Sequence, residues 1–268
     1  MKLKTFRTIL IGLAGILVMM PGCSPQPAEE AVMEEPVAVE ETADNTLTPE
    51  EEADGWELLF DGSSLDKWRA FRGEEVPPGW VVQEGTVFFD GKDAGEGYGD
   101  LTTREQFADF ELKLEWKISP EGNSGILYRV SEDQEQEFHS GPEMQIIDDK
   151  AERYSELEAN RRSGANYGLQ APAVDNVKPV GEWNSVHLVV DGAHVEHWQN
   201  GDKVVEYELW TPEWKEAVAA TKFSEWPSYG MNKKGHIVLQ DHGAGVWFKN
   251  IKIRRLNEDG ETSDETEE

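Results

Sequence analysis

Apolar and polar residues alternate without interruption over residues 110–118, where Phe, Leu, Leu, Trp and Ile are separated by Glu or Lys. Successive side chains of a strand point to opposite faces, so this pattern predicts a half-buried antiparallel strand. Residues 80–82 and 86–89 are two further apolar segments, joined by Glu84-Gly85. They predict a hairpin, because glycine is well suited to such a turn.

A second hairpin is predicted over residues 186–198, where two apolar-rich segments flank Asp191-Gly192. Asp-Gly is a strong signal for a two-residue hairpin turn. We therefore expect Val190 to pair with Ala193, and Val186 with His197. This register places His197 on an apolar face, where a hydrogen-bonded core histidine is one interpretation and a binding residue the other.

The rest of the chain contains more strand segments and one clear helix signal. Asn200-Gly201 is a turn before the apolar residues 204–209, and residues 237–241 and 246–254 are further strands. Residues 211–223 predict a helix, because Thr211 can cap it and proline follows at the first helical position. Many short strands separated by turns predict an all-β fold in which two antiparallel sheets form a sandwich.

Charge divides the chain into a domain and two acidic ends. The chain has 268 residues, with 25 Lys and Arg against 54 Asp and Glu, a formal net charge of −29. Residues 24–54 contain eleven acids and no base, and residues 257–268 contain seven acids and no base. Such segments cannot bury enough apolar surface to fold. We expect a disordered tether over 23–54, a domain over 55–256 and a disordered tail over 257–268.

The N-terminus has the layout of a bacterial secretory signal. A basic start is followed by a short apolar stretch and then by Gly22-Cys23. A cysteine at this position resembles a lipobox, which implies cleavage after residue 22 and lipidation of Cys23. The expected location is the cell envelope, with the lipid anchor in the outer membrane. The alternative is a conventional signal peptide and an incidental free cysteine.

Composition excludes several classes of function. The acidic charge excludes a strongly basic nucleic-acid binder, and a single cysteine excludes a thiolate metal cluster. The sequence has no Gly-x-Ser-x-Gly, His-Glu-x-x-His, P-loop or Gly-x-Gly-x-x-Gly motif. The sequence thus requires no cofactor. A divalent metal stays open, with the acidic loop 133–137 or His139 beside Glu143 as its weak candidates.

Polar residues of unusual type share strand faces. In a strand, residues two apart lie on one face, which places Glu143 with Gln145, Gln240 with His242, and Arg129 with Leu127. Amides and paired charges suit sugar hydroxyls, which both donate and accept hydrogen bonds. The two interpretations are a carbohydrate groove and an ordinary solvated face. Tyr167 and Trp226 are the aromatic candidates for stacking on a sugar ring.

Six segments in order along the chain resemble one family. They are Leu59–Trp68, Asn123–Ile126 with Arg129, Gly141–Asp148, Gly181–Asn184, His197–Gly201 and Gly235–Ile251. The chain resembles the 3-keto-disaccharide hydrolase domain family. This resemblance implies a concanavalin-like jelly roll and cleavage of glycosides that carry a ketone at C3.

The implied chemistry needs a base near C2, an acid for the leaving oxygen and a group that holds the enolate oxygen. Together with strand register, the resemblance selects Glu143 or His242 as acid or base and Arg129 for the oxyanion. The expected substrate-binding residues are Gln145, Gln240, Asn123, Asp148, Asp241, His197 and Tyr167.

The resemblance also implies partners and leaves alternatives open. The substrate would be a small saccharide, and an oxidoreductase would have to make the 3-keto sugar upstream. The alternatives are a non-catalytic sugar-binding module, a conventional glycosidase on unoxidised sugar, and a structural surface protein. The sandwich fold alone would not separate them.

Overall fold

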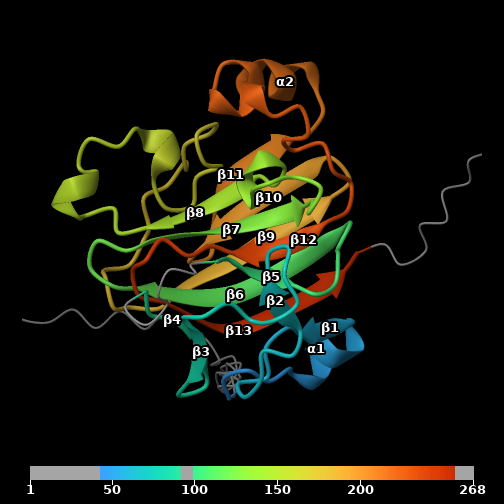
Figure 1. The fold of residues 1–268 in the computed structure, drawn as a ribbon, viewed down its shortest axis with the longest axis vertical. Helices are drawn as coiled ribbons and strands as arrows, with labels where there is room; N and C mark the ends of the chain where they lie inside the picture. The colour runs from blue at the N-terminus through green and yellow to red at the C-terminus, as the bar shows by residue number, and fades with distance from the viewer. Residues whose placement is uncertain (1–42, 92–98, 257–268) are drawn as a thin grey trace, which may run out of the picture. The chain divides into compact units, whose positions relative to one another are not determined.

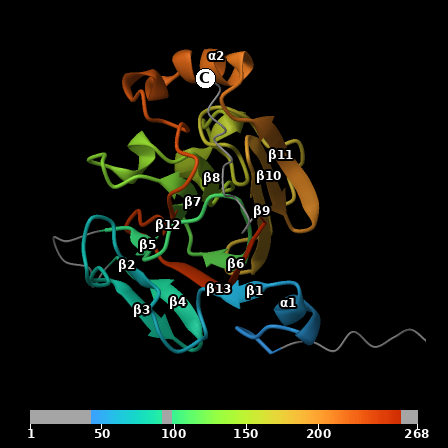
Figure 2. The ribbon, with the colours of Figure 1, turned by 90° about the vertical axis from the view of Figure 1, so that its right-hand side faces the viewer.

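The structure is a computed structural model that describes residues 43–91 and 99–256. The described residues form two antiparallel sheets packed face to face, as Figures 1 and 2 show. The eight-stranded sheet has the order β11-β10-β9-β6-β13-β4-β3, and β1 pairs with β13. The five-stranded sheet has the order β2-β5-β12-β7-β8. The predicted two-sheet, jelly-roll-type sandwich is confirmed.

The elements have the following bounds. The strands are β1 Trp56–Leu58, β2 Trp68–Ala70, β3 Trp80–Gln83, β4 Thr86–Phe89, β5 Leu101–Thr103, β6 Phe110–Ile118, β7 Asn123–Val130, β8 Glu143–Ile147, β9 Asn184–Asp191, β10 His194–Gln199, β11 Asp202–Glu208, β12 His236–Leu239 and β13 Val246–Arg255. The α-helices are α1 Pro49–Ala53 and α2 Pro212–Ala219, and the 3₁₀ turns are η1 Glu137–His139, η2 Glu152–Tyr154, η3 Ala159–Arg161 and η4 Lys222–Glu225.

Strand β6 shows why the alternating pattern predicts the layers. Its residues alternate between buried and intermediate exposure along its whole length, as the sequence predicts. The apolar residues of β6 meet those of the other sheet, and Trp116, Ile126, Met144 and Phe248 all belong to one core cluster. Removal of this apolar area from water is what holds the two layers together.

The hairpin of β9 and β10 differs from its predicted register. Asp191 pairs with His194, and Val190 pairs with Val195 rather than with Ala193. Gly192 has φ +57°, so Gly192 and Ala193 form the turn and Asp191 joins the strand. His197 nevertheless stays on the apolar face, because the register differs by two residues and a shift of two leaves the alternation of faces unchanged.

Residues 43–54 belong to the domain, so the prediction that they are part of a disordered tether is wrong. The Asn250 backbone N–H donates to Asn45 Oδ1 at 2.9 Å, and Lys249 pairs with Asp44. Thr48 caps α1 through a capping box. These polar contacts with β13 supply order that the segment's few apolar residues cannot. Residues 1–42, which include the predicted signal and Cys23, and the tail 257–268 lie outside the described residues.

The helix over residues 211–223 is confirmed in part. Thr211 accepts a hydrogen bond from the Trp214 backbone N–H, as a helix N-cap does, but α2 ends at Ala219. Trp214 is buried and stacks between Tyr207 and Tyr229, whereas Ala217 is exposed. None of the helices within residues 43–91 and 99–256 has the length and apolarity that a membrane crossing requires.

Candidate active site

The outer face of the five-stranded sheet carries the predicted polar residues of β8. Met144 and Ile146 point into the core between the sheets. Glu143 and Gln145 alternate with them and therefore lie on the opposite face, as predicted, and both are buried. Residues 164–167, in the loop after β8, run beside Glu143 and Gln145 and form hydrogen bonds with their backbones. A buried carboxylate and a buried amide outside the core require a specific explanation.

Gly125 leaves the space that the Glu143 carboxyl occupies. A methyl group built on Gly125 would lie 2.3 Å from Glu143 Oε1. The carboxyl therefore lies over the backbone of β7, the neighbouring strand, in space that any other side chain at position 125 would occupy. This close approach explains why the sequence has glycine in the middle of a strand.

Strand register aligns this carboxyl with other polar groups. Gly125 pairs with Gln145 on β8, and its carbonyl accepts a hydrogen bond from the Gln240 backbone N–H at 3.0 Å. On the far side of Gln240, Asp100 Oδ1 accepts from the Asp241 backbone N–H at 2.9 Å. The result is a polar row formed by Asp100 before β5, Gln240 after β12, the Glu143 carboxyl over β7 and Gln145 on β8.

A cavity of about 640 Å³ opens at the Asp100 end of this row. Its lining includes the predicted residues Gln240, Asp241 and His242, together with Asp100 and Glu137. The lining also contains two aromatic residues and one basic residue, Phe71, Phe138 and Arg72. A volume of this size accepts a disaccharide-sized ligand.

Burial raises the pKa of the carboxyls in this site and lowers the pKa of the imidazole. Burial raises the pKa of Glu143 to about 8, against the opposing charge of Lys222. It also raises the pKa of Asp100, whose carboxyl faces that of Glu137. Partial burial lowers the pKa of His242 below its ordinary value. At neutral pH the site therefore holds a protonated carboxyl and an unprotonated imidazole, the states of a general acid and a general base.

Tyr167, an aromatic candidate for the site, lies beside Glu143. The Tyr167 backbone N–H donates to the Glu143 carbonyl at 3.0 Å, and Lys222 Nζ lies 5.0 Å from the centre of the Tyr167 ring. Lys222 also lies 5.6 Å from the ring of Phe138, which connects this group to the cavity. Trp226, the other aromatic candidate, stacks on His139 at 4.4 Å.

Arg129 is not in the site, and the prediction that it shares a face with Leu127 is wrong. Its φ is +51°, and the pairing of β7 with β12 is irregular at this point, as in a β-bulge. The side chain turns toward the eight-stranded sheet, where it donates to the Ala108 and Gly192 carbonyls and to Asp109. Arg129 thus joins the two layers and cannot hold an oxyanion in the cavity.

Two more predicted binding residues have structural roles. Asp148 accepts hydrogen bonds from the backbone N–H groups of Glu121 and Lys150, which shapes the loop after β8. His197 is fully buried, and its ring bonds to the Gly164 carbonyl and to Tyr128. Burial lowers the pKa of His197 to about 4, so it is a neutral core histidine and not a ligand of substrate.

The remaining candidates are placed as follows. Asn123 starts β7 two residues before Gly125, on the same face, and its Oδ1 is buried with no hydrogen-bond partner within residues 43–91 and 99–256. The strand that was expected to extend to Asp241 ends at Leu239, so Asp241 and His242 both reach the cavity from a loop.

The weak metal candidates do not form a cluster. Among the described residues, the group of three ligand atoms within 4.8 Å consists of His194, Glu196 and Glu206, on the other sheet. Glu137 of the acidic loop instead turns toward Asp100, and His139 stacks on Trp226. The two carboxyls and His242 are oxygen and nitrogen donors at one cavity, but they do not meet the geometry of a formed metal site.

Sequence reasoning missed Asp100, Arg72, Lys222 and the role of Glu137. Asp100 follows a glycine-rich segment and Glu137 lies in an acidic run, and both patterns are typical of solvated loops. The chain brings them together from positions far apart in sequence. Only Gly125, in the middle of an apolar strand, was a local signal that another group approaches closely there.

Comparisons with known proteins agree with this fold. A curated relative from Bacteroides thetaiotaomicron, named 3-keto-disaccharide hydrolase, is 36% identical over 77% of this chain and 80% of its own. A crystal structure of a putative glycosyl hydrolase from Parabacteroides distasonis has 37% identity and a TM-score of 0.74, covering 80% of this chain and all of that one. Another from the same organism has 25% identity and a TM-score of 0.55, over 75% and 84% of the two chains. The family model for the 3-keto-alpha-glucoside-1,2-lyase-like domain matches residues 55–254, and the chain belongs to this family.

Proposed function

We propose that this protein is a hydrolase that cleaves the glycosidic bond of 3-keto disaccharides. The name of the curated relative and the membership of the family support the substrate class. The observation that carries the mechanism is the buried Glu143 carboxyl, which occupies the space at Gly125 and interacts with the charge of Glu137. Glu137 lines the same cavity as His242.

The reaction proceeds in two steps. A ketone at C3 acidifies the C2–H bond, so a base removes this proton and the electrons form an enolate. The bond from C1 to the leaving oxygen then breaks, and an acid protonates that oxygen. Water adds to the resulting C1–C2 double bond, so that the sum is hydrolysis. A lyase step followed by hydration agrees with both the family description and the relative's name.

The protonation states suggest one role for each group. Glu143, whose pKa is raised, donates the proton to the leaving oxygen, and the unprotonated His242 accepts the C2 proton. Arg72 at the cavity wall replaces Arg129 as the cation that stabilises the enolate oxygen. Gln240 and Asp241 contact the sugar hydroxyls from the cavity floor.

The test is release of product from a chromogenic 3-keto-glucoside beside its unoxidised parent, each with and without chelator. Release from the keto sugar alone supports the proposal, and the chelator arm decides whether a metal takes part. Release from both sugars would indicate a conventional glycosidase. Saccharide binding without release would indicate a binding module.

The pH profile of kcat/KM should have two limbs. Activity should fall as the pH decreases through the lowered pKa of His242, below 6.5, because the base becomes protonated. It should also fall as the pH rises through about 8, because Glu143 loses the proton it donates. Steady-state kinetics from pH 4 to 10 measure both limbs, and His242→Gln should abolish the acidic one. A profile that keeps rising above pH 9 would contradict an acid role for Glu143.

Gly125→Ala should reduce turnover by about 10- to 100-fold while the protein stays folded. The new methyl group meets the end of the Glu143 side chain, which is flexible and can move away. The carboxyl is then displaced from the polar row. Turnover and urea denaturation of the variant measure the two effects. Val81→Ala, at an exposed position of β3 in the other sheet, is the control. Equal turnover in Gly125→Ala and wild type would contradict this placement.

The proposal also covers the cellular location of the protein and the reaction that supplies its substrate. The basic start, apolar stretch and Gly22-Cys23 support a lipid anchor at Cys23 in the cell envelope, most simply the outer membrane. Cys23→Ser should move the protein from the membrane fraction to the soluble fraction. An oxidoreductase that oxidises C3 of the sugar must act upstream, because the proposed mechanism contains no redox step.

A further inference from the structure

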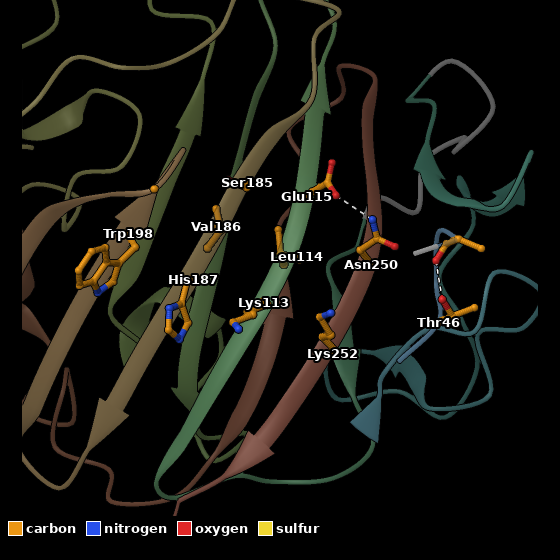
Figure 3. A pocket seen from close by; sticks show the side chains of 12 residues that line it. Thr46, Lys113, Leu114, Glu115, Ser185, Val186, His187, Trp198, Asn250 and Lys252 are labelled. Carbon is orange, nitrogen blue, oxygen red and sulfur yellow. Dashed lines mark hydrogen bonds between the residues drawn. The ribbon is translucent and has the colours of Figure 1, made fainter. Parts of the chain in front are cut away.

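A second cavity, of about 490 Å³, lies on the outer face of the eight-stranded sheet. Figure 3 shows its lining, which comes from β6, β9, β10, β13 and the segment around Thr46. The candidate active site lies on the outer face of the other sheet. The two cavities are therefore separated by the whole sandwich, and this one takes no part in the proposed reaction.

One row of side chains crosses the floor of this cavity. Trp198 pairs with His187, His187 with Lys113, and Lys113 with Lys252, so the four lie on neighbouring strands. All four side chains are visible together in Figure 3. The Trp198 indole N–H donates to Glu196 Oε2 at 2.7 Å, which fixes the orientation of the ring. The row thus begins with a fixed aromatic ring and ends with two cations.

Lys113 forms no direct ion pair among the described residues, although its charge acts on Glu51. Lys252 pairs with Glu51, and Lys203 at the edge of the same row pairs with Glu196 and Glu206. Lys113 has no carboxylate oxygen within 4.0 Å among the described residues, and its Nζ lies 4.5 Å from the ring of Trp56. Glu115 also lines the cavity, but Lys113 and Lys252 place two ammonium groups side by side there, and only Lys252 is held in a direct ion pair. A lysine without a direct carboxylate contact is a group that can bind a ligand carboxylate.

The other walls supply donors and acceptors. Ser185 and Asn250 line the cavity, and the Asn250 side-chain amide donates to Glu115 Oε1 at 2.7 Å. The wall opposite Trp198 contains Thr46, and Asn45 and Asn250 hold this segment to β13 through reciprocal hydrogen bonds. An aromatic ring beside short polar side chains suits a sugar, whose ring has an apolar face and hydroxyls at its edge.

We propose that this cavity is a second saccharide-binding site, selective for a sugar that carries a carboxylate, such as a uronic acid. The pyranose ring stacks on Trp198, and the carboxylate binds Lys113. Ser185 contacts the hydroxyls, and Asn250, whose amide is bonded to Asp44 and Glu115, shapes the wall. This inference depends on the outer face of the eight-stranded sheet alone and stands whether or not the protein cleaves keto sugars.

The test compares cellobiouronic acid with cellobiose, its neutral counterpart, by calorimetric titration of the full chain. The uronic acid should bind at least about tenfold more tightly, because a charge-assisted bond replaces a neutral one. Lys113→Gln should remove this preference, and Trp198→Ala should weaken binding of both sugars. Increasing salt should reduce the preference in the wild type.

Lys117→Gln is the matched control. Lys117 lies four residues further along β6, on the same face, and its Nζ is 4.8 Å from the ring of Trp183, outside the cavity. This variant should keep the preference, and keto-sugar turnover should stay within about twofold of wild type in all three variants. Equal binding of the two sugars, no binding of either, or an equal effect of Lys113→Gln and Lys117→Gln would overturn the proposal.

Discussion

Glu143→Gln should reduce turnover of a 3-keto-glucoside by about a thousandfold, since general acid catalysis contributes roughly 10²- to 10⁴-fold. The amide keeps the shape of the carboxyl over Gly125 but has no acidic proton. KM should change little, because the loss affects the transition state. Glu121→Gln, an exposed acid beside Arg153, is the control and should leave turnover unchanged. Intact turnover in Glu143→Gln would remove this residue from the mechanism.

The same substitution should make the protein more stable. Burial raises the pKa of Glu143 to about 8 from an ordinary 4.5, so the folded state disfavours its charged form. The free energy of unfolding of the wild type therefore falls as the pH rises from about 4.5 to 8, and glutamine removes this loss. Glu143→Gln should exceed the wild type by a few kcal/mol at pH 8 and match it near pH 4. Urea denaturation at both pH values measures the difference, and a gap independent of pH would contradict the assignment.

Arg129→Ala should have the opposite signature, with large loss of stability and little change in kcat. Its guanidinium donates to the Ala108 carbonyl at 2.9 Å, and to the Gly192 carbonyl and Asp109 Oδ1 at 2.8 Å each. Removal leaves these acceptors without their donor and deletes the contact with Trp210, at 5.5 Å. Loss of one member of a buried ion pair costs about 3–5 kcal/mol.

The readouts for Arg129 separate a structural from a catalytic role. Urea denaturation should show the stability loss, and kcat at a temperature where the variant is still folded should stay within about threefold of wild type. Arg129→Lys should be intermediate in stability, because one ammonium cannot reach all three acceptors. Arg153→Ala, an exposed arginine, is the control. A kcat loss in a fully folded Arg129→Ala would restore the oxyanion role that the sequence suggested.

The candidate site shows where local patterns stop being informative. Alternation correctly placed Glu143 and Gln145 on the face away from the core, because β8 is regular. The same rule misplaced Arg129, because a positive φ in β7 reverses the direction of its side chain. No local pattern marks Asp100, because its importance depends on Glu137 and Asp241, which the fold brings beside it.

The sequence by itself determined the layers of this protein, because burial of one strand face is a local, periodic requirement that every strand must meet. It therefore predicted the sandwich, the hairpins, the start of α2 and the outward position of Glu143. Only the tertiary structure decided the register of β9 with β10, the docking of residues 43–54 on β13, and the cavity that His242 shares with Asp100. These features depend on hydrogen bonds and space between residues distant in sequence, such as the gap that Gly125 leaves for Glu143.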